Sequence, residues 1–325
     1  MTKMIRVHEV GGPEAMRFED VDLGAPGAGE VRIRHTAVGL NYIDVYFRTG
    51  LYPAPSVPFT PGMEAAGEVV AIGDSVTEFA VGDRVAYAAP PLGAYSEERL
   101  MPADRIVKIP DGVSDEQAAA MMLKGMTAEY LLRRTFPVKA GQTILFHAAA
   151  GGVGLIACQW AKSLGVTVIG TVGSDEKAEL AKAHGCEHTI VYSRENVAEA
   201  VREITGGEGV PVVYDSVGKD TFEASIDSLA PIGTMVSFGN ASGPAPDVNP
   251  GLLSQKGSLF FTRPTLMTYT AKREDLVASA DALFDVVGSG AVKVEVHQTF
   301  PLADAAEAHR ALEGRKTTGS TLLMP

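Results

Sequence analysis

The sequence feature that most limits the fold is a glycine-rich turn between a strand pattern and a helix pattern. The turn is Ala148-Ala149-Ala150-Gly151-Gly152-Val153-Gly154, and it follows the apolar stretch 143–148. Its pattern is A-x-G-x-x-G, with Ala149 in the place of the first glycine of the dinucleotide-binding fingerprint. Gly151 would let the backbone approach a pyrophosphate, and Gly154 would let the helix pack close to the sheet. The N–H groups at a helix N-terminus bind phosphate, so the turn predicts a dinucleotide site.

Strand and helix patterns alternate on both sides of this turn. The strand patterns occupy 143–148, 166–171, 188–192, 210–216 and 233–239, and the helix patterns occupy 152–164, 175–184, 194–205 and 219–229. Ser174 and Ser193 stand where helix N-caps are expected. Alternation at these lengths predicts an α/β domain, with a parallel sheet covered by helices on both faces.

The first third of the chain has short strand patterns bounded by Gly, Pro and Asp, which predict an antiparallel β domain. These strand patterns are 31–38, 67–73 and 83–87, with turns at 11–13, 25–27 and 52–55. Ser114-Asp115-Glu116-Gln117 predicts a capping box before a helical run at 118–123. Near the end of the chain, we expect elements that return to the β domain: a helix at 273–287, a strand at 292–299, a helix at 302–314 and a strand at 320–324.

Composition excludes several classes of protein. The apolar fraction of 46% and the charged fraction of 21% are those of a globular chain. The net charge of −12 argues against general nucleic-acid binding, because an acidic surface repels the phosphate backbone. Two cysteines, Cys158 and Cys186, cannot build a disulfide framework or a four-cysteine zinc site. The segment 1–6 lacks the apolar core of a signal peptide, and no stretch approaches a membrane span, so we expect a cytoplasmic protein.

The end of the second strand of the α/β region indicates which dinucleotide is bound. Sites for NAD carry an acid there, about 20 residues past the glycines, but 170–174 is Gly-Thr-Val-Gly-Ser. Lys177 follows in the next helical turn, and Tyr192 ends the adjacent strand. Lys177 is equally well interpreted as a solvated helix residue. Taken with the missing acid, the pattern favours NADP over NAD.

Several segments together identify a family. They are Asn41-Tyr42-Ile43-Asp44, Gly50-Leu51-Tyr52-Pro53, Leu123-Lys124-Gly125-Met126-Thr127-Ala128, 147–158, 213–218 and Phe238-Gly239-Asn240. In these segments, and over essentially its whole length, the chain resembles the NADPH:quinone oxidoreductases of the zeta-crystallin type, within the medium-chain dehydrogenase/reductase superfamily. The likeness is strongest to the bacterial members. The resemblance implies a GroES-like catalytic domain at 1–124 and 266–325, a Rossmann NADPH-binding domain at 125–265, and a homodimer formed through the cofactor domains.

Zinc alcohol dehydrogenases of the same superfamily place a cysteine ligand near Asn41 and a Gly-His-Glu motif near 62–64. Met63 stands here at the histidine position, and neither cysteine lies in this region. Since Met is a poor zinc ligand, we expect no metal. A quinone needs no Lewis acid, because it is electron-poor and accepts hydride directly from the nicotinamide.

The resemblance also implies site residues. Asn41, Tyr46 and Tyr52 border the nicotinamide and the substrate: Asn41 would bond the ribose, and Tyr46 would offer its O–H to a quinone oxygen. Tyr46 is as well interpreted as a core aromatic, and packing of the loop is slightly favoured for Tyr52. Asp44 and Glu64 are interpreted as internal carboxylates, and His147 as structural. Implied cofactor contacts are Asn41, Thr127, Tyr130, Ala150, Gly151, Gly152, Val153, Gly173, Ser174, Lys177, Tyr192, Ser216, Phe238, Gly239, Asn240, Phe261, Thr262, Arg263 and Arg315.

The sequence thus predicts an NADPH-dependent quinone reductase. Two alternatives remain open. The first is a zinc-free enoyl or alkenal reductase on the same scaffold, which needs a proton donor such as Tyr46 or Tyr52. The second is a protein that binds NADPH without turnover.

Overall fold

The computed structural model describes residues 1–54 and 56–325, so Pro55 of the predicted turn 52–55 lies outside the described residues. The chain divides into two compact units. The first unit comprises Met1–Met126, Thr270–Gly288 and Val294–Pro325, and the second comprises Thr127–Tyr269 and Ser289–Lys293. The domain junctions at 124/125 and 265/266 stay predictions.

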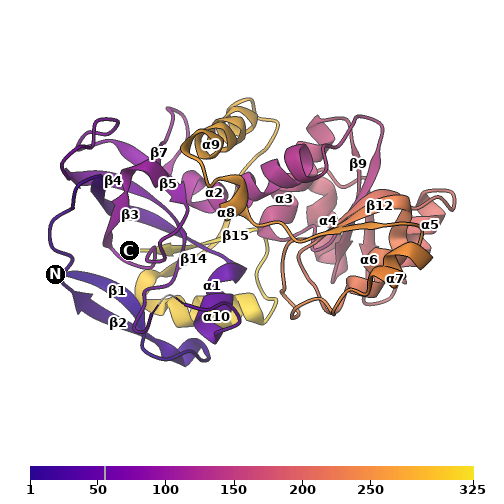
Figure 1. Ribbon diagram of the computed structural model, residues 1–325, viewed down its shortest axis with the longest axis horizontal. Coiled ribbons are helices and arrows are strands. Elements are labelled where there is room, and N and C mark those ends of the chain that lie inside the picture. The colour runs from indigo at the N-terminus through magenta and orange to yellow at the C-terminus, as the bar shows by residue number, and fades with distance from the viewer. Residues whose placement is uncertain (55) are drawn as a thin grey trace. The chain divides into compact units, whose positions relative to one another are not determined.

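The second unit is built on a parallel sheet whose strands are ordered β10-β9-β8-β11-β12-β13. Figure 1 labels β9 and β12 of this sheet. The strands are β8 (Thr143–Phe146), β9 (Thr167–Val172), β10 (His188–Val191), β11 (Val210–Asp215), β12 (Leu229–Ser237) and β13 (Phe260–Thr262). In chain order this is the doubly wound order 3-2-1-4-5-6, which confirms the predicted Rossmann fold. In this order the chain leaves β8 on one side and returns to β11 on the other, and ligands bind at such a reversal.

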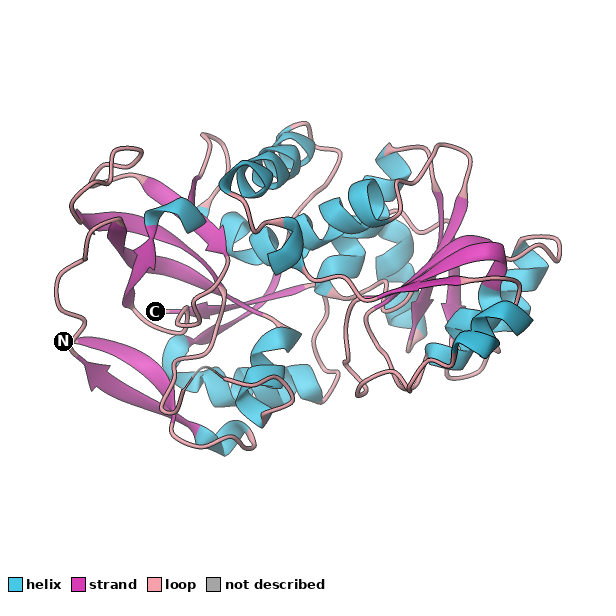
Figure 2. Ribbon diagram, viewed as in Figure 1, coloured by secondary structure: helices cyan, strands magenta, loops and turns pink. Residues whose placement is uncertain are grey.

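Helices cover this sheet, as Figure 2 shows. They are α3 (Gly152–Ser163), α4 (Asp175–Ala183), α5 (Val197–Ile204), α6 (Phe222–Ser228) and α7 (Pro250–Gln255), and the short helix α8 (Leu266–Tyr269) follows β13 in the chain. The helices α3 and α4 pack on β9, and α6 packs on β11 and β12. The core between the layers is apolar: Leu145, Ile169 and Val213 on three neighbouring strands are fully buried.

Two local expectations for this unit are wrong. Ser193 is not the N-cap of α5: Asn196 is, because its Oδ1 accepts hydrogen bonds from the N–H groups of Ala198 and Glu199 at 3.1 and 3.3 Å. The Glu195 carboxylate accepts the Val191 N–H at 2.8 Å and so holds a turn in place of the first predicted helical turn. Strand β12 ends at Ser237, so the predicted strand end at 239 is also wrong.

The first unit contains a largely antiparallel sheet ordered β14-β15-β3-β4-β5-β7, with β6 paired to β3, and a separate pair β1-β2. The strands are β1 (Thr2–Val7), β2 (Met16–Val21), β3 (Glu30–Leu40), β4 (Glu64–Ile72), β5 (Arg84–Ala88), β6 (Glu98–Pro102), β7 (Val107–Lys108), β14 (Val296–Pro301) and β15 (Ser320–Met324). The helices are α1 (Tyr42–Thr49), α9 (Arg273–Gly288), α10 (Ala305–Glu313) and α2 (Asp115–Tyr130), whose residues from Thr127 onward belong to the second unit. C-terminal β15 pairs with β3, so the last strand does return to the β-rich unit.

The predicted capping box is confirmed. The Ser114 hydroxyl accepts the Gln117 N–H at 3.1 Å, and the Gln117 side chain accepts the Ser114 N–H at 3.2 Å. Near the C-terminus, β14 begins at Val296 rather than 292, and the helix predicted from 302 begins as a 3-10 turn that leads into α10 at Ala305. In the part of the chain that the structure describes, no helix has the length and apolarity needed to cross a membrane.

Candidate functional site

The glycine-rich turn forms a tight corner between β8 and α3. Gly151 is the N-cap of α3, and its N–H donates to the Ala148 carbonyl at 2.9 Å. A Cβ on Gly154 would lie 2.5 Å from the carbonyl oxygens of both Ala148 and Ala149, so only glycine fits there. The left-handed residue of the turn is Ala148, with φ of 54°, although alanine disfavours that conformation.

The first turn of α3 fits a phosphate group. Within these described residues, no side chain caps the helix and the first turn carries no acid. The backbone N–H groups that follow Gly151 therefore face an anion without a competing carboxylate. The positive end of the helix dipole adds to their attraction for a pyrophosphate.

A buried chain of hydrogen bonds lies beside this turn. His147 is fully buried and contacts Thr171 Oγ1 through Nδ1 at 2.9 Å and Ser225 Oγ through Nε2 at 3.0 Å. The Ser225 hydroxyl in turn donates to the Asp215 carboxylate at 2.8 Å. Burial lowers the pKa of His147, so the imidazole is neutral. Its partners tie the ends of β8, β9 and β11 together, in agreement with a structural role for His147.

The ends of β9 and β10 bring together the residues predicted to bind a 2′-phosphate. A Cβ on Gly173 would lie 2.7 Å from the Tyr192 hydroxyl oxygen, so that hydroxyl lies directly over the glycine. Ser174 is the N-cap of α4 and accepts the Lys177 N–H at 3.3 Å. Tyr192 is 46% exposed, so its hydroxyl is accessible from solvent.

The other predicted contacts of the second unit fall into two groups. At the ends of β11 and β12, a Cβ on Gly239 would lie 2.5 Å from the Ser216 carbonyl oxygen, and Phe238 contacts Phe146 at 5.8 Å between ring centroids. These residues lie at the ligand-binding end of the sheet. Phe261 on β13 packs on Phe222 instead, at 6.4 Å.

Four more predicted contacts of this unit have other surroundings. Tyr130 is buried and stacks on Tyr269 at 4.5 Å, and Thr127 is buried one helical turn earlier. Arg263 donates to the Pro264 carbonyl at 3.0 Å, and Thr262 precedes it at the end of β13.

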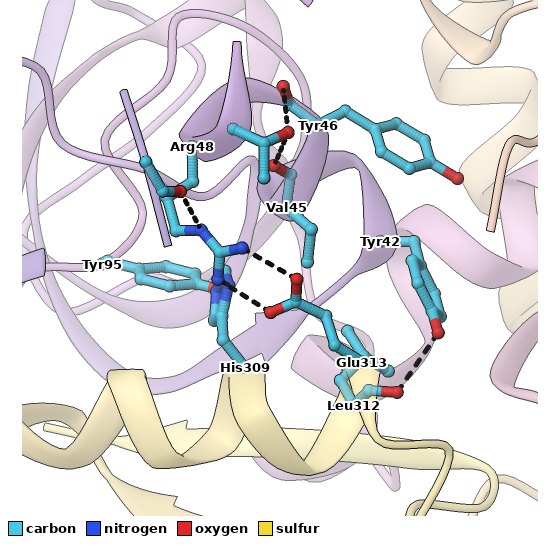
Figure 3. A network of polar contacts seen from close by, with 10 residues as sticks. Tyr42, Val45, Tyr46, Arg48, Tyr95, His309, Leu312 and Glu313 are labelled. Atoms are coloured by element: carbon cyan, nitrogen blue, oxygen red, sulfur yellow. Dashed lines mark hydrogen bonds and ion pairs between the residues drawn. The ribbon is translucent and has the colours of Figure 1, made fainter. Parts of the chain in front are cut away.

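The predicted catalytic tyrosines gather around α1 in the first unit. The rings of Tyr46 and Tyr52 meet edge to face at 5.2 Å, and Tyr42 lies 6.3 Å from Tyr46. Tyr42 and Tyr46 are four residues apart and so share one face of α1. The Tyr42 hydroxyl donates to the Leu312 carbonyl at 3.1 Å, and Figure 3 shows the Tyr46 ring pointing away from Arg48.

The opposite face of α1 is held by a buried polar network (Figure 3). Arg48, 1% exposed, forms a two-pronged ion pair with Glu313 at 2.8 and 2.9 Å and donates to His309 Nδ1 at 3.1 Å. The Tyr95 hydroxyl contacts His309 Nε2 at 2.9 Å and donates to the Asp44 carboxylate at 3.0 Å. Since Nδ1 accepts from Arg48, His309 carries its proton on Nε2. The network thereby fixes both the orientation of α1 and the direction in which its tyrosines point.

Asn41 is the N-cap of α1, and its side-chain amide is engaged within the protein. Its Nδ2 donates to the Glu64 carboxylate at 2.7 Å, and its side chain and Asp44 form a reciprocal capping box. Glu64 also accepts the Leu123 N–H at 2.7 Å and pairs with the Lys124 ammonium at 3.0 Å. Both members of this ion pair are buried, so Asp44 and Glu64 are internal carboxylates, as predicted.

The residues at the zinc position of related alcohol dehydrogenases do not fit a zinc ion. Met63 is buried where a histidine ligand would stand, and Lys124 already supplies the positive charge beside Glu64. Among the residues that the structure describes, no three His, Cys, Asp or Glu side chains are placed to hold one metal ion. A divalent cation next to the Lys124 ammonium would be repelled.

Arg315 lies in the first unit, directly after the residues that close α10. Its N–H donates to the Leu312 carbonyl at 3.1 Å, and its φ is 57°. The left-handed position at the end of a helix is usually a glycine, yet Gly314 beside it has φ of −72°. A non-glycine residue in this conformation is strained, and such strain is found most often at functional positions.

Comparisons with known proteins agree over the whole chain. A family model described as an alcohol dehydrogenase GroES-like domain matches residues 27–111, and one described as a zinc-binding dehydrogenase matches 152–285. A quinone oxidoreductase of Pseudomonas aeruginosa is 58% identical over 325 residues and 100% of both chains. A 2-haloacrylate reductase of Burkholderia is 49% identical over 98% of both chains. The crystal structure of Escherichia coli quinone oxidoreductase complexed with NADPH matches with a TM-score of 0.98 at 50% identity, covering 99% of this chain and 100% of that one.

Proposed function

The chain belongs to the quinone oxidoreductases of the medium-chain dehydrogenase/reductase superfamily, and from this premise we propose that it reduces quinones with NADPH and without a metal. The use of NADPH is supported by two observations. No side chain caps the start of α3 and its first turn has no acid, and the end of β9 also lacks an acid. The Tyr192 hydroxyl over Gly173 supports binding of a 2′-phosphate.

When bound, NADPH supplies a hydride from its nicotinamide, and with one proton this converts a quinone into a hydroquinone. The protein binds and orients the two reactants. The start of α3 holds the pyrophosphate, and Ser174, Lys177 and Tyr192 hold the 2′-phosphate. Asn41 Nδ2 donates to Glu64 at 2.7 Å and to the Gly39 carbonyl at 3.5 Å, so a ribose contact by Asn41 would replace the longer of these two bonds.

On the substrate side, Tyr46 donates its phenolic O–H to the quinone oxygen that gains negative charge, and Tyr52 packs against it. The edge-to-face contact between the two rings keeps Tyr46 in one orientation. The absence of a fitting metal site, argued above for the described residues, supports a reaction in which no Lewis acid takes part.

The function is tested by a side-by-side assay of ortho-quinones and 2-enones with NADPH, on protein dialysed against a strong chelator. Turnover of quinones well above that of enones is expected. The identity to a 2-haloacrylate reductase favours one second candidate, reduction of an electron-poor C=C bond. Faster turnover of enones or 2-haloacrylates would select that candidate, tight NADPH binding without any turnover would select a binding protein, and loss of activity on dialysis would contradict metal independence.

Replacing Tyr46 by phenylalanine should slow the reaction without abolishing it. A hydrogen bond to a developing oxyanion contributes roughly 0.5–3 kcal/mol, which is up to about a hundredfold in rate. Steady-state kinetics with a reactive quinone should therefore show lower kcat but measurable turnover. Tyr42→Phe is the matched control, because the Tyr42 hydroxyl is bonded to Leu312. Complete loss of turnover in folded, NADPH-binding Tyr46→Phe would argue for obligatory proton donation and for the enone reductase.

Replacing Lys177 by alanine should weaken NADPH binding and leave NADH binding almost unchanged. A charge-assisted hydrogen bond to the 2′-phosphate contributes about 1.5–3 kcal/mol, so the NADPH dissociation constant should rise about ten- to a hundredfold. Titration of both cofactors measures the effect. Lys182→Ala, on the same helix and paired with Glu179, is the control. Equal weakening of both cofactors would show that Lys177 does not bind the phosphate.

We also propose that the protein is a homodimer formed through the cofactor domains. Strand β13 is an edge of the parallel sheet, and its Phe260 side chain is 60% exposed. An unpaired apolar edge favours association with a second copy. Sedimentation should show a dimer for the parent and mainly monomer for Phe260→Lys, whereas Ile72→Lys in the first unit should stay dimeric. A monomeric parent, or a dimeric Phe260→Lys, would contradict the proposal.

A cytoplasmic location is proposed from the two cysteines, which are free thiols. The net charge of −12 likewise supports the proposal that nucleic acid is not a general partner.

A further inference from the structure

The first turn of α4, next to the proposed 2′-phosphate site, carries two acids, Asp175 and Glu176, and the structure gives Asp175 a partner. Building on the proposed use of NADPH, we infer that Arg194 is a specificity-determining residue: it neutralises Asp175, so that this carboxylate does not repel the 2′-phosphate proposed to bind beside Lys177. Arg194 does not itself bind the phosphate. It acts by removing the repulsion that Asp175 would otherwise exert on it.

The strand register places the two residues beside the pocket. Strands β9 and β10 are parallel neighbours, with Val172 opposite Val191. The chain therefore leaves both strands at the same edge, and Asp175 and Arg194 each follow three residues after this pair. The guanidinium donates to both carboxylate oxygens of Asp175, at 2.5 and 2.8 Å.

Asp175 is poorly placed for a site that binds a phosphate. It is the first residue of α4 and directly follows Ser174, whose neighbourhood takes the phosphate. The Arg194 guanidinium holds the pKa of the Asp175 carboxyl below its usual range, so the acid is ionised at neutral pH. An uncompensated carboxylate there would repel a phosphate group and would oppose the attraction of Lys177.

The pair therefore serves the charge of the pocket rather than the stability of the fold. Both side chains are well exposed, at 56% for Arg194 and 74% for Asp175, and exposed pairs contribute little to folding. The Glu195 carboxylate also lies 3.9 Å from the Arg194 Nε, and Lys182 acts on Asp175 from about two turns further along α4. Neither Glu195 nor Lys182 forms two hydrogen bonds to this pair, so Arg194 is the main partner that compensates the charge of Asp175.

The test uses adenosine 2′,5′-bisphosphate and 5′-AMP, which differ only by the 2′-phosphate. Calorimetry measures the dissociation constant of each for the parent, Arg194→Gln, Asp175→Asn and the double variant. Arg194→Gln should weaken the bisphosphate by about two- to sevenfold, more at low than at high salt, and leave 5′-AMP unchanged. The double variant should return to within about twofold of the parent. Lys182→Gln is the matched control for loss of one exposed cation from α4.

Each of the other outcomes contradicts one part of this inference. A selective loss that persists in the double variant would mean that Arg194 contacts the phosphate itself. No selective loss in Arg194→Gln, or an equal loss in Lys182→Gln, would mean that the Asp175–Arg194 pair does not set specificity. A parent that binds both probes equally would overturn the inference together with the proposed preference for NADPH, and that failure is visible before any variant is made.

Discussion

Replacing Lys124 by methionine is expected to destabilise the first unit by about 3–5 kcal/mol. The Lys124 ammonium is the cation that compensates Glu64, and both side chains are buried. Removing one partner of a buried ion pair leaves an uncompensated buried charge, and that charge accounts for most of the loss. Hydrogen exchange of the amides in β3 and β4, which surround the pair, measures the free energy of opening of this unit.

The double variant Lys124→Met with Glu64→Gln is the control for this prediction. It removes both charges and keeps one oxygen, which can accept from either the Asn41 side chain or the Leu123 N–H but not from both, because these donors bond different oxygens of Glu64. It should therefore recover at least half of the lost free energy, because no unpaired charge remains. If Lys124→Met changes the free energy by less than 1 kcal/mol, the ammonium does not compensate Glu64 in the folded protein.

The parts of the fold that sequence patterns predicted are those where one physical signal dominates. The alternation of strands and helices from 143 onward leads directly to the parallel sheet, and the Ser114 capping box has the predicted hydrogen bonds. Ser193 was wrongly predicted to be the N-cap of α5, because serine is a good cap and this serine precedes a helical pattern. Asn196 is an equally good cap three residues later, and the Glu195 side chain decides between them by holding the intervening turn.

The candidate site was predictable where it depends on backbone shape and was missed where it depends on tertiary pairing. Gly154 was singled out by the glycine pattern of the turn and Gly173 by the acid-free end of the second strand, and in the structure a Cβ would clash at both positions. Lys124 directly follows the predicted helical run 118–123 and lies within α2, and a lysine in such an apolar helix is buried only when it is paired, so a signal did exist. No pattern in the sequence connects Arg48 with His309, because 261 residues separate them and only packing of α1 on α10 brings them together.

The same packing predicts how stability depends on pH, because Asp44 and His309 belong to one buried chain and shift in opposite directions. Burial raises the pKa of Asp44 from 3.8 to about 7. Burial, and then the nearby Arg48 guanidinium, lower the pKa of His309 from 6.5 to about 3. Asp44 thus favours folding at low pH and loses that contribution as pH rises toward 7. His309 favours folding above pH 6.5 and loses that contribution as pH falls toward 3.

Between pH 4.5 and 6.5 the two effects should largely cancel in the parent, and single substitutions should reveal them. Each proton difference changes the free energy of unfolding by about 1.4 kcal/mol per pH unit, or about 2.7 kcal/mol over this interval. Relative to the parent, His309→Asn should lose less stability on acidification, and Asp44→Asn should lose more. Urea unfolding at the two pH values measures both slopes, with Tyr42→Phe as a control that contacts α10 but does not titrate here. If the free energy of unfolding depends on pH in the same way in all four proteins, neither buried group titrates as this network requires. If the two variants differ from the parent in opposite directions, the residues from Arg48 to Asp44 are what keeps the stability of the first unit nearly constant between these pH values.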